Sequence, residues 1–240
     1  MRIGIIDSGV GGLNVLPPLI TTLGGEYIYI ADNAYAPYGT LSAEQLNGRI
    51  GSLCNRLCDN NVDCIVLGCN TASLTFLPDE VGGKRVFKLK QDFSSAGESS
   101  LVLSTLLSSE RLFDYLPTGA ISLGLQNLAT DIENSLPDVG VMRDELTLRL
   151  RRYCPSSVYL ACTHYVYLRN IVEEIFPRTP VYDGIDGLVE EVRGYYSYPP
   201  PAPLTPVKIY FTGDKEVTKY KKIVNNCFSV KFPLVFCDDL

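Results

Sequence analysis

The sequence predicts an α/β protein with two similar α/β domains whose sheets are mostly parallel. Short apolar runs alternate along the 240 residues with segments whose apolar residues recur at helical spacing, and no long all-β stretch interrupts them. Two of the runs, residues 64–69 and 157–162, each end on a cysteine that a polar residue follows. This repeated construction indicates two related halves, each of which presents a thiol.

The first expected strand covers residues 2–6 and runs into a glycine-rich turn. Asp7 stands at the end of this strand, and the turn Ser8-Gly9-Val10-Gly11-Gly12 precedes a helix that starts at about residue 13. A turn of this kind exposes backbone N–H groups that can bind an anion. Its spacing fits neither the Rossmann fingerprint nor a P-loop. A plain tight turn would not require the carboxylate of Asp7, so we expect this residue to belong to a site.

The rest of the first half continues the alternation. A strand at 26–31 leads into a long turn at 32–40. Ser42, with Gln45 three residues later, predicts a capping box at the start of the next helix. The remaining elements expected in this half are a strand at 64–69, a helix at 71–77 and an edge-like strand at 85–90.

The second half follows the same plan. We expect strands at 99–105, 119–124 and 157–162. Residues 106–111 begin a helix, and further helices are expected at 127–134, 143–153, 165–175 and 185–195. Residues 198–203, Tyr-Pro-Pro-Pro-Ala-Pro, form the one clear linker, because such a segment continues neither a helix nor a central strand. A strand at 207–211, a helix at 216–227 and a strand at 230–236 follow it.

Two cysteines and the only histidine are the candidate chemical groups. Cys69 and Cys162 each lie where a buried strand turns into a helix, and open α/β sheets bind ligands outside the carboxyl ends of their strands. His164 lies two residues after Cys162. Taken singly, each cysteine is better explained as a small core residue, and the histidine as a structural hydrogen-bonding group. Two thiols at matching strand ends favour a functional role.

Composition and charge argue against several classes of function. The formal net charge of −6 disfavours a nucleic-acid partner, which requires a basic face. No apolar stretch approaches the length of a membrane span, and the N-terminal apolar run is too short for a signal peptide. We therefore expect a cytoplasmic protein whose eight cysteines are reduced. With no Cys-x-x-Cys and one histidine, no metal site is expected.

Four short motifs occur in order: Asp-Ser-Gly-Val-Gly-Gly at 7–12, Pro-Tyr-Gly-Thr at 37–40, Cys-Asn-Thr-Ala-Ser at 69–73 and Cys-Thr-His-Tyr at 162–165. Together they strongly resemble the glutamate racemases, within the wider aspartate/glutamate racemase group, and Tyr-Phe-Thr-Gly-Asp at 210–214 is similar to a later motif. The resemblance implies two α/β domains that face each other across a cleft. It also implies that the last strand and helix return to the first domain, which gives domains of 1–92 plus 205–240 and of 93–204.

The resemblance also assigns roles to individual residues. Cys69 and Cys162 match the two catalytic thiols, and Asp7 and His164 match polar residues that assist them. The positions that hold the substrate in the family are matched by Ser8, Tyr38, Gly39, Asn70, Thr71 and Thr163. The family implies a glutamate substrate, no cofactor, a homodimer, and a role in supplying D-glutamate for cell-wall peptidoglycan.

Racemisation without a cofactor explains why two thiols are needed. A weakly acidic proton must leave one face of Cα, and another must arrive on the opposite face, without an electron sink such as pyridoxal phosphate. The enzyme must therefore hold two acid/base groups, one on each side of the substrate. One cysteine acts as thiolate while the other is a thiol, and the roles swap with direction. We expect Asp7 to assist Cys69 and His164 to assist Cys162.

The middle of the chain, residues 84–135, departs from the family pattern. Lys88-Leu89-Lys90-Gln91-Asp92-Phe93-Ser94 stands where the family has proline-glycine. Gln126-Asn127 replaces the Cys-Pro that often precedes an acidic substrate-side residue, to which Glu133 is matched. These changes leave the substrate open, with aspartate or another amino acid as the alternative to glutamate. A non-catalytic binding or regulatory protein on a racemase scaffold also stays open. A thiol hydrolase or redox protein is a third class, which the absence of Cys-x-x-Cys disfavours.

Overall fold

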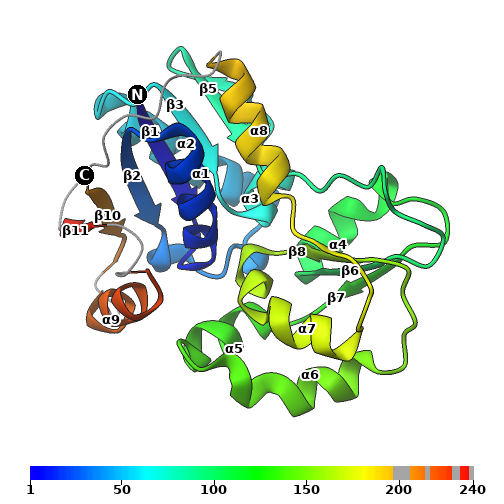
Figure 1. The fold of residues 1–240 in the computed structure, drawn as a ribbon. Helices are drawn as coiled ribbons and strands as arrows, with labels where there is room; N and C mark the ends of the chain where they lie inside the picture. The colour runs from blue at the N-terminus through cyan, green and yellow to red at the C-terminus, as the bar shows by residue number, and fades with distance from the viewer. Residues whose placement is uncertain (197–205, 214–216, 229–232, 238–240) are drawn as a thin grey trace. The chain divides into compact units, whose positions relative to one another are not determined.

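The structure is a computed structural model that describes residues 1–196, 206–213, 217–228 and 233–237. Contacts divide the chain into two compact units. Unit 1 comprises Met1–Lys90 and the described residues from Ile185 onward, and unit 2 comprises Gln91–Gly184. Both units are α/β with mostly parallel strands (Figure 1), which confirms the predicted fold class.

Unit 1 is built on one sheet whose described strands follow the order β11-β10-β2-β1-β3-β5-β4. Adjacent strands are parallel except for the β4–β5 pair. The strands are β1 (Arg2–Asp7), β2 (Glu26–Ala31), β3 (Cys64–Leu67), β4 (Glu80–Val81), β5 (Lys84–Lys88), β10 (Val207–Phe211) and β11 (Leu234–Cys237). The helices are η1 (Gly11–Val15), α1 (Leu16–Leu23), η2 (Asn33–Tyr35), η3 (Tyr38–Thr40), α2 (Ala43–Asp59), α3 (Asn70–Thr75), α8 (Ile185–Tyr195) and α9 (Val217–Phe228).

The sheet of unit 1 is buried on both faces, because helices cover each of them. Ile6, Ile65 and Val86 belong to an apolar cluster with residues of α2 and α3 on one face. Phe87, the next residue along β5, points the other way, and its ring meets that of Tyr195 of α8 edge-on, with 5.4 Å between ring centroids. Figure 1 shows α1 beside α8 on this second face. Burial on both faces explains the near-continuous apolar runs that predicted the strands.

The registers of the parallel strands bring their carboxyl ends to one edge of the sheet. Asp7 pairs with Ala31 across β1 and β2, and Ile6 pairs with Leu67 across β1 and β3. Strand β10 ends beside β2, since Phe211 also pairs with Ala31. The residues that follow β1, β2, β3 and β10 therefore gather at this edge, where open α/β sheets bind ligands.

Helix α2 begins with the capping box that Ser42 and Gln45 predict. The Gln45 backbone N–H donates to Ser42 Oγ at 3.2 Å, and the Ser42 backbone N–H donates to Gln45 Oε1 at 3.0 Å. These two bonds satisfy N–H groups that have no partner within the helix. The box thus fixes the first residue of α2 and, with it, which side chains the helix presents to the sheet.

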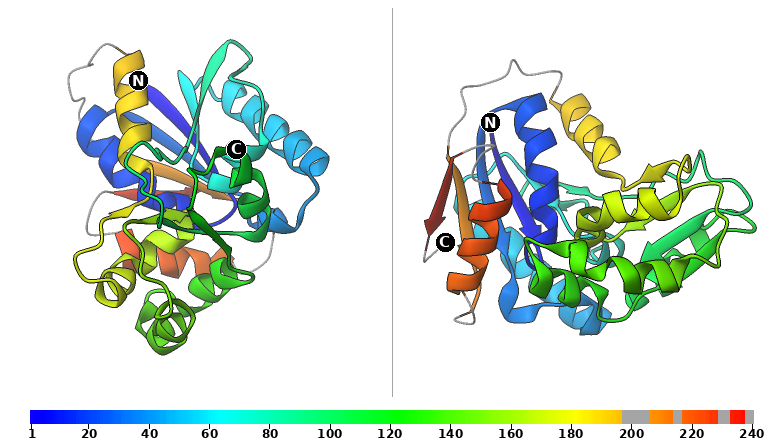
Figure 2. Two further views of the ribbon diagram at one scale, coloured as in Figure 1. Left: turned by 90° about the vertical axis from the view of Figure 1, so that its right-hand side faces the viewer. Right: turned by 60° about the horizontal axis from the view of Figure 1, so that its bottom comes forward.

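Unit 2 is built on a parallel sheet in the order β7-β6-β8-β9. Its strands are β6 (Leu101–Ser104), β7 (Ile121–Gly124), β8 (Val158–Ala161) and β9 (Val181–Tyr182). Its helices are α4 (Leu106–Leu112), η4 (Phe113–Tyr115), α5 (Leu128–Ser135), η5 (Val139–Met142), α6 (Arg143–Leu150), η6 (Thr163–Leu168) and α7 (Arg169–Ile175). Leu103 and Leu160 join residues of α5, α6 and α7 in one apolar cluster, and Figure 2 shows these helices from two further sides.

Several sequence predictions differ from the structure. Helix α8 belongs to unit 1, whereas the expected second domain extended to residue 204. The proline-rich segment 198–203 lies outside the described residues, and a run of prolines predicts where regular structure stops, not where one unit gives way to the next. The expected edge strand is the inner strand β5, which pairs with both β3 and β4. The strand expected at 230–236 is described only from Leu234.

None of the described helices is both long and apolar enough to span a membrane.

Candidate active site

The glycine-rich turn after β1 holds a buried carboxylate at the carboxyl edge of unit 1. Asp7 has no exposed surface, and its Oδ1 accepts a hydrogen bond from the backbone N–H of Gly9 at 2.8 Å. A Cβ on Gly12 would lie 2.7 Å from Asp7 Cβ and 3.0 Å from the carbonyl oxygen of Gly68. Only glycine permits this close approach. The turn therefore packs the carboxylate against the strand end that leads into Cys69.

Cys69 follows β3 and precedes helix α3. It is 7% exposed, is a free thiol, and has extended backbone angles. Asn70 and Thr71 open the helix and are buried beside it. The Oδ1 atom of Asn70 has no hydrogen-bond partner within the described part of the chain, so it is an uncommitted acceptor next to the thiol. Ser8, also buried, follows Asp7 in the turn.

Asp32, which follows β2, has no exposed surface and four side-chain hydrogen bonds. Arg49 of α2 donates from Nε to Oδ2 at 2.8 Å and from Nη2 to Oδ1 at 2.5 Å. Tyr38 donates from its hydroxyl to Oδ2 at 2.8 Å. Thr212, just after β10, donates to Oδ1 at 2.5 Å. This network, which we call the Asp32 network, joins three distant segments at the carboxyl edge of the sheet.

Tyr38 is held by this network close to Asp7 and Cys69. Burial raises the pKa of its phenol well above the ordinary value, and the negative charges of Asp32, Cys69 and Asp7 raise the pKa further. The phenol therefore stays neutral and donates its proton to Asp32. Gly39, the next residue in the short helix η3, is half-buried. The structure thus places Tyr38 close to Asp7 and Cys69, but its hydroxyl donates to Asp32 and is not available to donate to a ligand.

In unit 2 the second thiol, Cys162, follows β8 and precedes the helical turn η6. It is 6% exposed and free, and Thr163 and His164 beside it are also buried. His164 Nε2 lies 2.7 Å from Glu133 Oε1 of helix α5, and His164 is also hydrogen-bonded to Cys162. A carboxylate, an imidazole and a thiol therefore form one chain of hydrogen bonds in unit 2.

The electrostatics of His164 depend on two opposing effects. Complete burial lowers the pKa of the imidazole, but the hydrogen bonds with Cys162 and Glu133 together raise it more strongly. The net effect is a pKa well above the ordinary value, which favours the protonated ring. The surroundings of His164 therefore favour a positive charge and a transferable proton next to the thiol.

The structure thus distributes the predicted residues over two half-sites. Unit 1 carries Asp7, Ser8, Tyr38, Gly39, Cys69, Asn70 and Thr71, and unit 2 carries Cys162, Thr163 and His164. Sequence reasoning missed Asp32, Arg49 and Thr212. A signal for Asp32 was present, because it follows a predicted strand as Asp7 does. No group of three or more His, Cys, Asp or Glu residues able to hold a metal ion occurs among the residues described.

Individual proteins of known activity are similar to this chain over most of its length. No family model matches the chain. The glutamate racemase of Halothermothrix orenii is 33% identical over 214 residues, which cover 80% of this chain and 84% of that protein. The chain belongs to the glutamate racemase family. The glutamate racemase of Leptospira interrogans is 28% identical over 226 residues, which cover 83% of this chain and 84% of that protein.

Solved glutamate racemases share the fold. The Thermus thermophilus glutamate racemase in complex with beta-chloro-D-alanine has a TM-score of 0.81 and 24% identity, covering 99% of this chain and 96% of that one. The Escherichia coli glutamate racemase in complex with L-glutamate and the activator UDP-MurNAc-ala has a TM-score of 0.82 and 20% identity, covering 100% and 98%.

The Asp32 network predicts that removing Arg49 causes a large loss of stability, which a second substitution at Asp32 partly restores. Arg49→Ala leaves a buried carboxylate without its cation, so the free energy of unfolding should fall by about 3–5 kcal/mol. Adding Asp32→Asn removes that charge and should restore part of the loss. Urea unfolding followed by circular dichroism measures both. Arg56→Ala, on an exposed position of the same helix, should cost less than about 1 kcal/mol. A double variant no more stable than Arg49→Ala would contradict the prediction.

The single histidine allows a direct test of the Glu133–His164 bond. Because the folded pKa is raised, the stability due to protonation is fully present below the unfolded pKa and is lost as pH rises through the folded pKa. Glu133→Gln should lower the pKa of His164 and so reduce the stability that is lost as the pH rises. NMR titration of the untagged protein reports the pKa without ambiguity of assignment. Asp131→Asn, an exposed change on the same helix, is the control. An unchanged pKa in Glu133→Gln would refute the bond's role.

Proposed function

We propose that the protein interconverts L- and D-glutamate without a cofactor, with Cys69 and Cys162 as its two acid/base groups. The observation that carries the proposal is that each unit holds one nearly buried free thiol directly after a central parallel strand. Each thiol also has its own proton-handling neighbours, Asp7 in unit 1 and His164 with Glu133 in unit 2. Membership of the glutamate racemase family supports glutamate over aspartate as the substrate.

The mechanism uses one thiolate and one thiol. The thiolate removes the Cα proton from one face, and the opposite thiol delivers its proton to the other face. Asp7 assists Cys69, because it is the buried carboxylate at the end of the neighbouring strand β1. His164 assists Cys162 through the hydrogen bond between them, and Glu133 keeps the imidazole charged. After each turnover the roles are reversed, and the same groups return the protons.

The substrate is held by neutral groups of both half-sites. The hydroxyls of Ser8, Thr71 and Thr163 and the backbone near Gly39 bind the carboxylates, since hydrogen bonds can bind anions without a fixed cation. Asn70 Oδ1, which has no partner among the residues described, accepts a hydrogen bond from the substrate ammonium group. In this arrangement Tyr38 gives its proton to Asp32 and not to the substrate.

The cellular role follows from the same assignment. The enzyme works as a cytoplasmic homodimer and supplies D-glutamate for peptidoglycan, and so contributes to the cell wall and to cell shape. The family resemblance of the motifs supports this role.

The proposal predicts exchange at Cα that needs both thiols. Incubating the protein with L-glutamate in heavy water, without pyridoxal phosphate, should give deuterium incorporation together with loss of optical rotation. Cys69→Ala and Cys162→Ala should each slow racemisation by roughly 10²–10⁴-fold, because each removes a general acid/base. L-aspartate is the competing substrate to test beside it. No exchange with either amino acid, or full activity in either variant, would refute the proposal.

The pairing of helpers with thiols is tested by isotope effects. Enantiomers have equal free energy, so kcat/KM must be the same in both directions for every variant. Asp7→Asn slows proton transfer at Cys69, so the Cα-deuterium isotope effect should rise in the direction in which Cys69 removes the proton. His164→Asn should bias the isotope effect toward the opposite enantiomer. Polarimetry with Cα-deuterated L- and D-glutamate measures the isotope effect in each direction for both variants. A bias toward the same enantiomer in both variants would contradict the pairing.

A further inference from the structure

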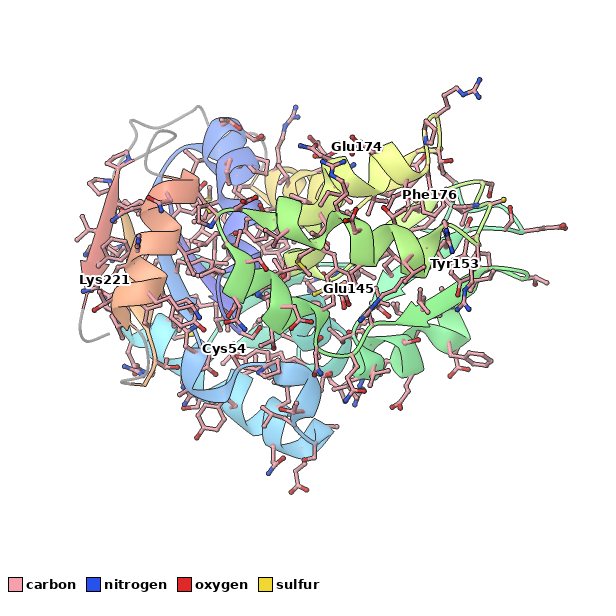
Figure 3. The ribbon with its side chains drawn as sticks, turned by 90° about the horizontal axis from the view of Figure 1, so that it is seen from below. Cys54, Glu145, Tyr153, Glu174, Phe176 and Lys221 are labelled. Atoms are coloured by element: carbon pink, nitrogen blue, oxygen red, sulfur yellow. The ribbon has the colours of Figure 1, made fainter. Side chains whose placement is uncertain are left out.

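A cavity of about 660 Å³ lies in unit 2 between α6, α7 and the segments that follow these helices. None of the candidate active-site residues lines it. Tyr153, Glu174 and Phe176, which border the cavity, are labelled in Figure 3. Its volume is within the range of small-molecule sites, about 300–1,000 Å³.

One wall of this cavity is apolar and fixed by the core. Ile171 and Phe176 line it and are buried members of the apolar cluster of unit 2. Tyr153 and Ile175 also line it and pack against the same cluster. Because these side chains are held by core packing, the wall is preformed and suits a flat apolar body.

The cavity also contains one cation without a partner. Arg143 and Glu174 line it, but they are ion-paired with each other. Arg151 also lines it, and its guanidinium has no ion pair or hydrogen bond within the described ranges. A planar guanidinium binds a carboxylate through two parallel hydrogen bonds. The apolar wall therefore complements an apolar group, and the cation complements a carboxylate at the other end of the same molecule.

We propose that this cavity binds a small organic carboxylate with a flat apolar body. The carboxylate pairs with Arg151, and the body lies against Ile171 and Phe176. A ligand with several negative charges fits less well, because the carboxylate of Glu174 also lines the cavity and Arg151 is the one lining cation without a partner among the described residues. The site is independent of the proposed racemase activity, since the two share no residue.

Biphenyl-4-carboxylate is a suitable probe, and Cys154 is a built-in reporter. Cys154 is an exposed free thiol that lines the cavity. Calorimetric titration of the full chain should give a dissociation constant below about 1 mM. The bound probe should slow alkylation of Cys154 by iodoacetamide about fivefold or more, because a ligand in such a cavity covers most of its lining. Peptide mass spectrometry follows Cys154, with the half-buried Cys58 of unit 1 as the internal control.

Two comparisons test the charge and the place of binding. Arg151→Ala should weaken binding about tenfold or more, because it removes a charged hydrogen-bonding partner. Arg149→Ala removes a guanidinium that is paired with Glu145 on the same helix and does not line the cavity, so binding should stay unchanged. The neutral biphenyl-4-methanol should bind both the unmodified protein and Arg151→Ala equally weakly. Equal affinity of the carboxylate for the unmodified protein and Arg151→Ala, or no protection of Cys154, would overturn the proposal.

Discussion

A carboxylate with no access to water is stable only when charges and hydrogen bonds satisfy it, and unit 1 is arranged around this requirement at Asp32. The partners of Asp32 come from helix α2, from the turn that contains Tyr38 and from the end of β10. Each partner fixes its own segment at the carboxyl edge of the sheet. Tyr38 is thereby held close to Asp7 and Cys69, and Thr212 ties the late strand β10 to the first half of the chain.

The two half-sites share a backbone design but differ in chemistry. Cys69 and Cys162 both have extended backbone angles, both follow a strand with neighbours on each side, and both lead directly into helical turns. In unit 1 the neighbouring charge is a carboxylate, which the glycine-rich turn packs against the strand end. In unit 2 it is an imidazole whose protonated form is favoured by its hydrogen bonds with Cys162 and Glu133. Related frames therefore place an acid beside one thiol and a base beside the other.

Local patterns were enough to predict much of this arrangement. The capping box of Ser42 and Gln45, the strand ends at Cys69 and Cys162, and the glycine-rich turn after β1 each depend on residues close together in sequence. The Asp32 network could not be predicted this way, because Thr212 lies 180 residues from Asp32. The assignment of α8 to unit 1 likewise depends on its packing against α1 and β5, which lie far from it in sequence and leave no local signal. Local sequence patterns thus locate the strand ends and the side chains at them better than the distant contacts that hold these segments in place.

The divergent middle of the chain contains one residue on which the second half-site depends. Burial alone would favour a neutral His164, and the carboxylate of Glu133 contributes to reversing that preference. Glu133 is positioned by α5, which begins after Asn127 in a left-handed conformation and buries Leu128 and Ile132 in the core of unit 2. The family pattern is lost at residues 88–94 and 126–127, and both segments lie outside this helix, the second directly before it. The position of Glu133 depends on the packing of α5, so departure from the family at these segments is compatible with an intact Glu133–His164–Cys162 chain.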